Sequence, residues 1–149
     1  MSALPPALAE IVEDFQAITE EQRLEMLLDF SEELPELPAR FAEHPDLLEQ
    51  VVECQTPLFL TIEVEPAGEH KVSLFFSAPP QAPTTRGFAS VLAQGLDGLP
   101  AADVLAVPDD MPNKLGLTRA LTPLRLRGMT AMLGRIKRQV SEQVAAAEA

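Results

Sequence analysis

Apolar positions in the first third of the chain recur at the spacing of an amphipathic helix. This pattern predicts a helix over residues 6–17. A capping box of Thr19 and Gln22 predicts a second helix, which ends at the proline-rich segment 34–38. Residues 39–48 are expected to be irregular or a short helical turn. The apolar faces of the two helices consist of Leu8, Ile11, Val12 and Phe15, and of Leu24, Leu27, Leu28 and Phe30.

The middle of the chain changes to the alternating pattern of β-strands. Residues 58–65 and 71–77 predict two strands, joined by a glycine-containing hairpin loop at 66–69. Residues 49–52 predict a short strand before them. One face of this sheet is strongly apolar, so helices are expected to cover it. That face consists of Leu58, Leu60, Ile62, Val64, Val72, Leu74 and Phe76.

Helical spacing returns after the proline-rich connector 78–83. Thr84 or Thr85 is expected to cap the next helix, and Thr122 with Pro123 the last one. The predicted helices are 84–95, 101–107 and a long final helix, with a short helix or an extended turn at 111–117. The final helix has a buried stripe of Met129, Leu133, Ile136, Val140 and Val144 and is expected to fray at 145–149. The whole chain is therefore predicted to be one α/β domain of the α+β type over 1–149, with a small antiparallel sheet of about three strands covered by helices.

Charge is distributed unevenly along the chain. Residues 1–53 carry 14 acids and two bases, whereas positions 111–141 carry seven bases and no acid. The acidic half argues against nucleic-acid binding. Two interpretations remain open: the basic final helix lies against the acidic N-terminal helices, or a polarised surface orients a protein partner. No stretch is apolar enough to span a membrane, and the N-terminus lacks the basic region of a signal peptide, so a cytoplasmic location is expected.

Cys54 is the only cysteine, so it forms no internal disulfide and lacks the companions of a structural zinc site. Its polar neighbours and Pro57 predict a loop at the entrance of a strand, where the thiol is either buried and inert or exposed and reactive. His44 and His70 are expected to be surface residues rather than catalytic partners of the thiol. Phosphate-binding loops and hydrolase motifs are absent from the sequence, and no cofactor or metal is expected.

Five segments resemble the SufE family, sulfur acceptors that work with cysteine desulfurases in iron–sulfur cluster assembly. In chain order they are 53–56, 82–88, 104–108, 115–117 and 121–129, and the resemblance extends over roughly residues 10–140. The first segment matches the G-C-Q-S pattern around the persulfide-carrying cysteine of that family. Two positions depart from the family pattern: Glu53 stands where glycine is common, and Pro57 where a polar residue is usual.

The resemblance implies a compact fold similar to the scaffold protein IscU, and it implies a function. Cys54 would take persulfide sulfur from a pyridoxal-phosphate-dependent cysteine desulfurase and pass it to a SufB-like scaffold for cluster assembly, without a cofactor of its own. The resemblance makes Gln55, Arg86 and Arg125 candidates for partner docking. Alternatives are a docking regulator in which Cys54 is incidental, or a redox-sensing thiol.

Two physical expectations accompany that function. Cys54 is expected to be at least partly shielded in the absence of a partner, because a persulfide in open solvent is lost to small thiols and oxidants. Arg125 falls in the first turn of the final helix, where its charge opposes the helix dipole. Its guanidinium is therefore expected to pair with an internal carboxylate or with a carboxylate of a partner.

Overall fold

The computed structural model describes residues 4–148, which begin with two helices where they were predicted. α1 spans Pro6–Gln16 and α2 spans Glu20–Glu32. The capping box is confirmed: Thr19 Oγ1 accepts a hydrogen bond from the Gln22 N–H at 3.3 Å, and Gln22 Oε1 accepts one from the Thr19 N–H at 3.1 Å. The segment after α2 contains a short helix, α3 (Ala39–Ala42), and a 3₁₀ turn, η1 (Pro45–Leu47).

The sheet is antiparallel with strand order β1-β2-β3, as the sequence predicted. Its strands are β1 (Glu49–Gln50), β2 (Phe59–Val64) and β3 (Val72–Ser77). The predicted apolar face is buried, apart from Val64, which is half-buried. β1 is shorter than predicted because the chain turns into a 3₁₀ segment, η2 (Val52–Cys54), after only two paired positions.

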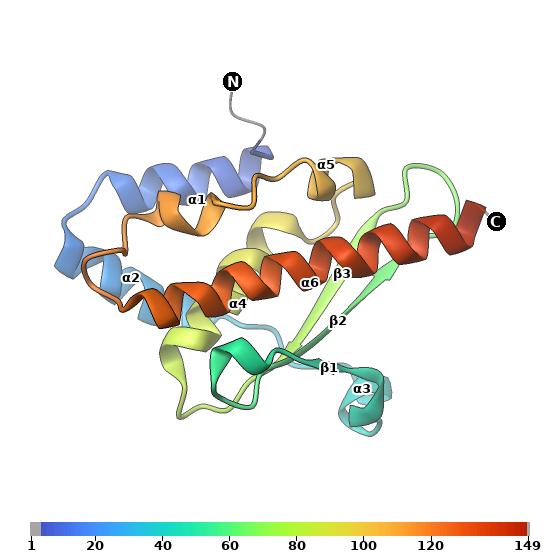
Figure 1. Cartoon of the computed structure of the whole chain (residues 1–149), viewed down its shortest axis with the longest axis horizontal. Helices are drawn as coiled ribbons and strands as arrows, with labels where there is room; N and C mark the ends of the chain where they lie inside the picture. Colours follow the sequence, from blue (N-terminus) through green and yellow to red (C-terminus); the bar gives the residue numbers. More distant parts are fainter. Residues whose placement is uncertain (1–3, 149) are drawn as a thin grey trace.

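Two glutamines of the final helix take the place of a strand beside β2. Beyond the end of β1, Gln139 Oε1 accepts a hydrogen bond from the Ile62 N–H at 3.1 Å. Gln143 accepts one from the Val64 N–H at 2.9 Å and donates one to the Ile62 carbonyl at 2.8 Å. An unpaired strand edge invites pairing with another chain. The side chains of α6 thus protect this edge and fix the helix along the sheet (Figure 1).

The remaining helices follow the predicted order with shifted ends. They are α4 (Pro83–Leu96), α5 (Ala101–Leu105), the 3₁₀ turn η3 (Met111–Leu115) and α6 (Pro123–Glu148). The predicted threonine cap of α4 is wrong, since Pro83 already begins the helix with its fixed φ and neither threonine caps it. Fraying at the end of α6 is also not seen: residues 145–148 are helical, and Ala149 lies outside the described residues.

Most of the basic residues near α6 find acidic partners, though not mainly on the N-terminal helices. Arg135 of α6 pairs with Glu49 and Glu53, which lie in β1 and η2. Between the predicted N-terminal helices and the basic segment, the described residues show a single ion pair, Arg119–Glu20 at 3.7 Å. α1 buries Leu8, Val12 and Phe15, and α2 buries Leu27, whereas Leu28 of the predicted apolar face is exposed. Most of the acids of the two helices lie in solvent. The interpretation that the basic residues pair within the chain, with carboxylates of its acidic half, is therefore correct. The interpretation that these partners lie mainly on the N-terminal helices is wrong.

Candidate functional site

Cys54 is the last residue of the η2 turn, between β1 and β2. The turn is closed by hydrogen bonds from the Cys54 N–H to the Val51 carbonyl and from the Gln55 N–H to the Val52 carbonyl, both 3.1 Å long. Gln55 then takes a left-handed conformation with φ 58°, which is uncommon for a residue other than glycine. The thiol is half-buried, as expected for a shielded but reachable sulfur.

A pocket of about 240 Å³ opens beside the thiol. It lies where η2, α4 and the first turns of α6 meet. Of the four residues that the sequence marked as candidates, three line it: Cys54, Gln55 and Arg125. The full lining is Cys54, Gln55, Thr56, Thr85, Phe88, Leu124, Arg125 and Gly128. Three segments of the family resemblance, 53–56, 82–88 and 121–129, thus meet around one sulfur.

Gly128 permits the close contact between the Cys54 turn and α6. A Cβ atom at position 128 would lie 3.1 Å from the Cys54 sulfur and 3.3 Å from its Cα, closer than ordinary contacts allow. The thiol donates a long hydrogen bond, 3.7 Å, to the Gly128 carbonyl. Sequence reasoning had placed Gly128 in a motif without assigning it a role. Its role in packing depends on a contact between residues 74 positions apart.

The environment of Cys54 favours the neutral thiol. Burial is the largest cause, the charge of Glu53 adds to it, and the charge of Arg135 opposes it; together they raise the pKa of Cys54 to about 11. Since a thiolate is the nucleophile in sulfur exchange, this closed arrangement holds the sulfur in its unreactive form. Reactivity then requires that the turn open or that a partner change the surroundings of the thiol.

The alkylation rate of Cys54 by iodoacetamide is expected to keep rising between pH 9 and pH 11. A free cysteine, with its ordinary pKa of 9.0, is half ionised at pH 9 and gains only about two-fold more in rate above it, whereas a thiol with a pKa of about 11 gains about fifty-fold between pH 9 and pH 11. The neutral thiol stabilises the closed turn fully below pH 9, and that contribution is lost as the pH rises from 9 towards 11. A rate that rises only about two-fold above pH 9 and levels off by about pH 10 would show that the thiol is not held as this geometry requires.

Arg125 and Arg86 have different surroundings. Arg125 is exposed at the mouth of the pocket, and no carboxylate within residues 4–148 forms an ion pair with it. Arg86 is half-buried, and its guanidinium donates to the carbonyls of Ser31 and Ala78 at 3.2 and 2.7 Å. Arg86 is therefore engaged inside the protein, whereas Arg125 keeps an unpaired charge beside the thiol.

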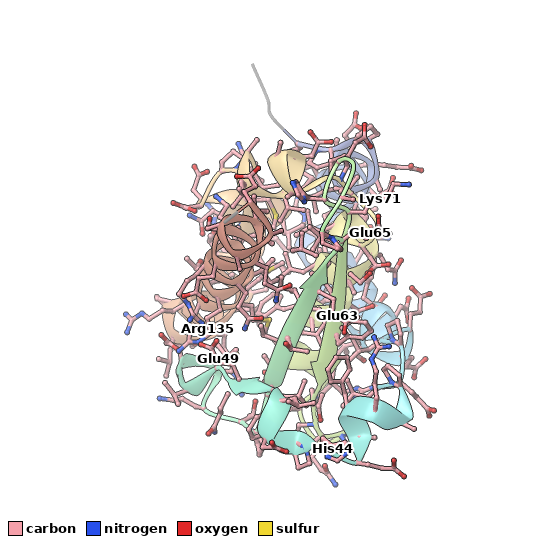
Figure 2. The ribbon with its side chains drawn as sticks, turned by 90° about the vertical axis from the view of Figure 1, so that its right-hand side faces the viewer. His44, Glu49, Glu63, Glu65, Lys71 and Arg135 are labelled. Carbon is pink, nitrogen blue, oxygen red and sulfur yellow. The ribbon has the colours of Figure 1, made fainter. Side chains whose placement is uncertain are left out.

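Neither histidine lines the Cys54 pocket. His44 is exposed at the N-terminal end of η1 (Figure 2). His70 contacts the Glu65 carbonyl through Nδ1 at 2.9 Å, at the hairpin. Within the described chain, no three His, Cys, Asp or Glu side chains are grouped so as to hold a metal ion. No helix in that part of the chain has the length and apolar character needed to cross a membrane.

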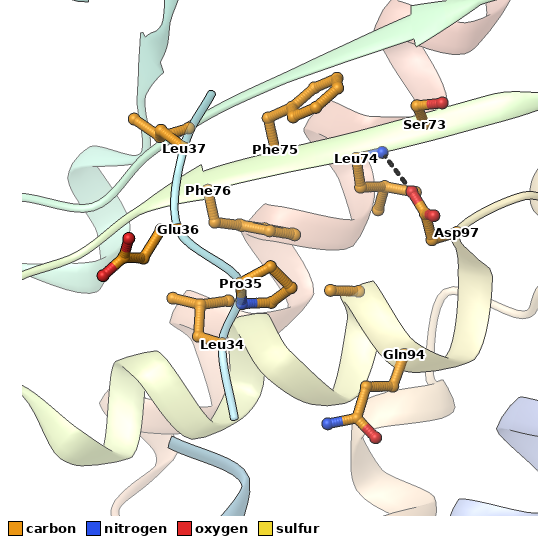
Figure 3. A pocket seen from close by; sticks show the side chains of 11 residues that line it. Leu34, Pro35, Glu36, Leu37, Ser73, Leu74, Phe75, Phe76, Gln94 and Asp97 are labelled. Atoms are coloured by element: carbon orange, nitrogen blue, oxygen red, sulfur yellow. Dashed lines mark hydrogen bonds between the residues drawn. The ribbon is translucent and has the colours of Figure 1, made fainter. Parts of the chain in front are cut away.

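A larger cavity, about 630 Å³, lies between the 34–37 segment, β3 and α4 (Figure 3). Its wall is formed mainly by apolar side chains and by Asp97, whose carboxylate accepts a hydrogen bond from the Leu74 N–H at 2.8 Å. That bond protects the outer edge of β3, as the glutamines of α6 protect the edge of β2. No cysteine lines this cavity, so the smaller pocket beside Cys54 is the candidate site for thiol chemistry.

Comparisons with known proteins agree with these observations. The family model "SufE: Fe-S metabolism associated domain" matches residues 9–140. An uncharacterized SufE-like protein of Mycobacterium tuberculosis is 54% identical over 141 residues, covering 95% of this chain and 96% of the relative. SufE-like protein 1, chloroplastic/mitochondrial, of Arabidopsis thaliana is 29% identical, over 87% of this chain and 33% of that protein. The solution structure of a hypothetical protein from Thermus thermophilus matches with a TM-score of 0.81 at 38% identity, covering 95% of this chain and 98% of that one.

Proposed function

Because this chain belongs to the SufE family, a family associated with iron–sulfur metabolism, we propose that Cys54 is a sulfur acceptor for a cysteine desulfurase. It takes the outer sulfur of the desulfurase persulfide and later gives it to a scaffold on which clusters are assembled. The protein acts as a carrier and activator, and pyridoxal phosphate belongs to the desulfurase. The observation that carries this proposal is the placement of the only thiol in a pocket formed by three of the family segments.

The transfer is a thiol exchange that needs no oxidant or reductant. The Cys54 thiolate attacks the outer sulfur of the persulfide, a new S–S bond forms, and the old S–S bond breaks. The sulfur of the desulfurase cysteine leaves as a thiolate, and Cys54 becomes the persulfide. The proton of the Cys54 thiol must leave before attack, which is why the raised pKa of the closed state matters.

The surface around the pocket fits a docking partner. Val52, the first residue of the Cys54 turn, and Leu124, which lines the pocket, are apolar yet exposed. Their exposed fractions are 62% and 42%. Exposed apolar groups beside an unpaired cation are typical of a protein interface. We propose that this surface, with Gln55 and Arg125, meets the desulfurase, and that Arg86 supports the fold behind it.

Counting the alanine that the desulfurase releases tests the proposal. With cysteine as the only small thiol and no downstream acceptor, a carrier fills in an initial burst, so the burst of extra alanine equals roughly one equivalent of this chain before free cysteine empties Cys54 by exchange. Adding a reductant that empties Cys54 should make the stimulation catalytic. A docking regulator would stimulate catalytically from the start, with no dependence on the reductant. That result would exclude the carrier function.

Arg125→Ala is expected to weaken stimulation of the desulfurase and to reduce its dependence on salt. The guanidinium is exposed and unpaired, so its loss removes attraction to a partner without removing an internal contact. The melting temperature is expected to change little, because exposed substitutions away from packing contacts usually have small effects. Arg127→Ala is the matched control, since Arg127 is also exposed but does not line the pocket. Equal effects of the two variants on stimulation would remove Arg125 from the docking surface.

A further inference from the structure

Arg135 in the middle of α6 contacts two glutamates of the segment that carries Cys54. Arg135 Nε donates to Glu49 Oε2 at 3.0 Å, and its Nη1 lies 2.8 Å from Glu53 Oε1. Figure 2 shows Glu49 and Arg135 facing each other between β1 and α6. Only 20% of the Arg135 side chain is exposed, so this charge is partly withdrawn from solvent. It therefore interacts with the two carboxylates more strongly than a fully hydrated charge would.

The two carboxylates are held unequally. Glu49 also accepts hydrogen bonds from Arg138 and from Gln139, the latter at 3.0 Å. Burial opposes its ionisation, but these bonds and the charges of Arg138 and Arg135 hold its pKa below the ordinary value. Glu53 has Arg135 alone among the described residues, and its buried Oε1 atom is not aligned for a hydrogen bond. The Glu53 contact is therefore the weaker of the two and should break first.

The other contacts that hold the turn closed are packing contacts, because Cys54 lies against Gly128 of α6 and against the edge of the core. Its three residues carry short-range backbone hydrogen bonds, and the sulfur bond to Gly128 is long. The charged groups facing the turn are Glu49 from β1, Arg135 and Arg138 from α6, and Arg125 at the pocket mouth. Of these described groups, Arg135 alone pairs with the turn itself. Breaking that pair would leave the turn held on α6 by packing alone, while Glu49 stays anchored to α6.

We propose that the Glu53–Arg135 ion pair is a latch that keeps the Cys54 turn closed against α6, with Glu49 as the fixed point about which the turn opens. If Cys54 is the sulfur acceptor proposed above, the latch sets the fraction of molecules in which the sulfur can be reached. A carboxylate of a partner that pairs with Arg135 in place of Glu53 would open the latch. The latch itself is a property of the isolated chain and can be tested without any partner.

In the proposed opening the turn unwinds, so amide hydrogen exchange at Cys54 and Gln55, which measures breaking of their hydrogen bonds to the Val51 and Val52 carbonyls, reports it without depending on the ionisation of the thiol. Glu53→Gln and Arg135→Gln are each expected to speed this exchange about five-fold, the size expected for a partly exposed ion pair. In the wild type the exchange should quicken with added salt, whereas in both variants it should depend less on salt. Glu43→Gln is the matched control, because it removes the same charge at an exposed position outside the network.

Thiol alkylation separates opening from charge effects. Glu53→Gln removes a charge that raises the pKa of Cys54, and Arg135→Gln removes one that lowers it, so the pH midpoints of alkylation should move in opposite directions. Faster amide exchange in both variants, with opposite midpoint shifts, supports the latch. Unchanged exchange at Cys54 and Gln55 in both folded variants overturns it. A wild type that opens as described but accepts no sulfur would refute the proposed function and leave the latch intact.

Discussion

Replacing Cys54 by serine is expected to abolish acceptance of sulfur and the release of extra alanine, while binding to the desulfurase stays within about two-fold. Serine keeps the shape of the side chain and adds no atom to the close contact with Gly128. Its hydroxyl forms no nucleophilic anion near neutral pH and no persulfide. The fold and the docking surface should therefore survive the change, and only the chemistry should be lost.

Binding and stimulation must be measured on the same preparations. Thr56→Ser is the matched control, since Thr56 lines the same pocket and the change leaves the thiol in place. Full stimulation by the Cys54→Ser chain would show that the protein acts by docking alone. Loss of binding together with stimulation would instead show that the sulfur contributes to the interface, which this structure does not predict.

Gly87→Ala is expected to destabilise the protein by about 2–3 kcal/mol, with a melting temperature lower by roughly 5–10 °C. A Cβ atom at position 87 would lie 2.5 Å from the Leu27 backbone carbonyl oxygen and 2.8 Å from its Cγ. Backbone cannot turn aside as a flexible side chain can, so α2 and α4 would have to separate. Because Thr85 and Phe88 of α4 line the Cys54 pocket, the same shift would disturb the site.

Gly134→Ala on α6 is the control for that prediction. No atom lies within 4 Å of a Cβ at position 134, so alanine there should be neutral or stabilise the helix by up to about 1 kcal/mol. Thermal unfolding followed by circular dichroism compares the two variants. Equal melting temperatures for both would contradict the close packing of α2 on α4.

Local signals in the sequence predicted much of the fold. The Thr19–Gln22 cap, the alternating strands and the Thr122–Pro123 start of α6 each depend on neighbouring residues, and each was confirmed. What was missed depends on distant partners. The pairing of Gln139 and Gln143 with the edge of β2 joins residues about eighty positions apart, and no helical pattern encodes it.

The candidate site likewise combines features that neighbouring residues encode with features that depend on distant partners. The sequence placed Cys54 at a strand entrance, because polar neighbours and Pro57 are visible locally. It did not predict that β1 would end after two paired residues, nor that Glu53 would reach Arg135 on α6. Both features join residues that are far apart in the sequence or depend on how the turn packs, so local patterns do not encode them.

The mass of the intact chain after incubation with a desulfurase and cysteine tests the central claim most directly. We predict a gain of one sulfur atom, located by peptide mapping to the segment containing Cys54, removed by a reductant and absent from the Cys54→Ser chain. Because the chain has one cysteine, no second thiol can confuse the assignment. An unchanged mass, measured while the same sample stimulates the desulfurase, would contradict sulfur carriage by Cys54.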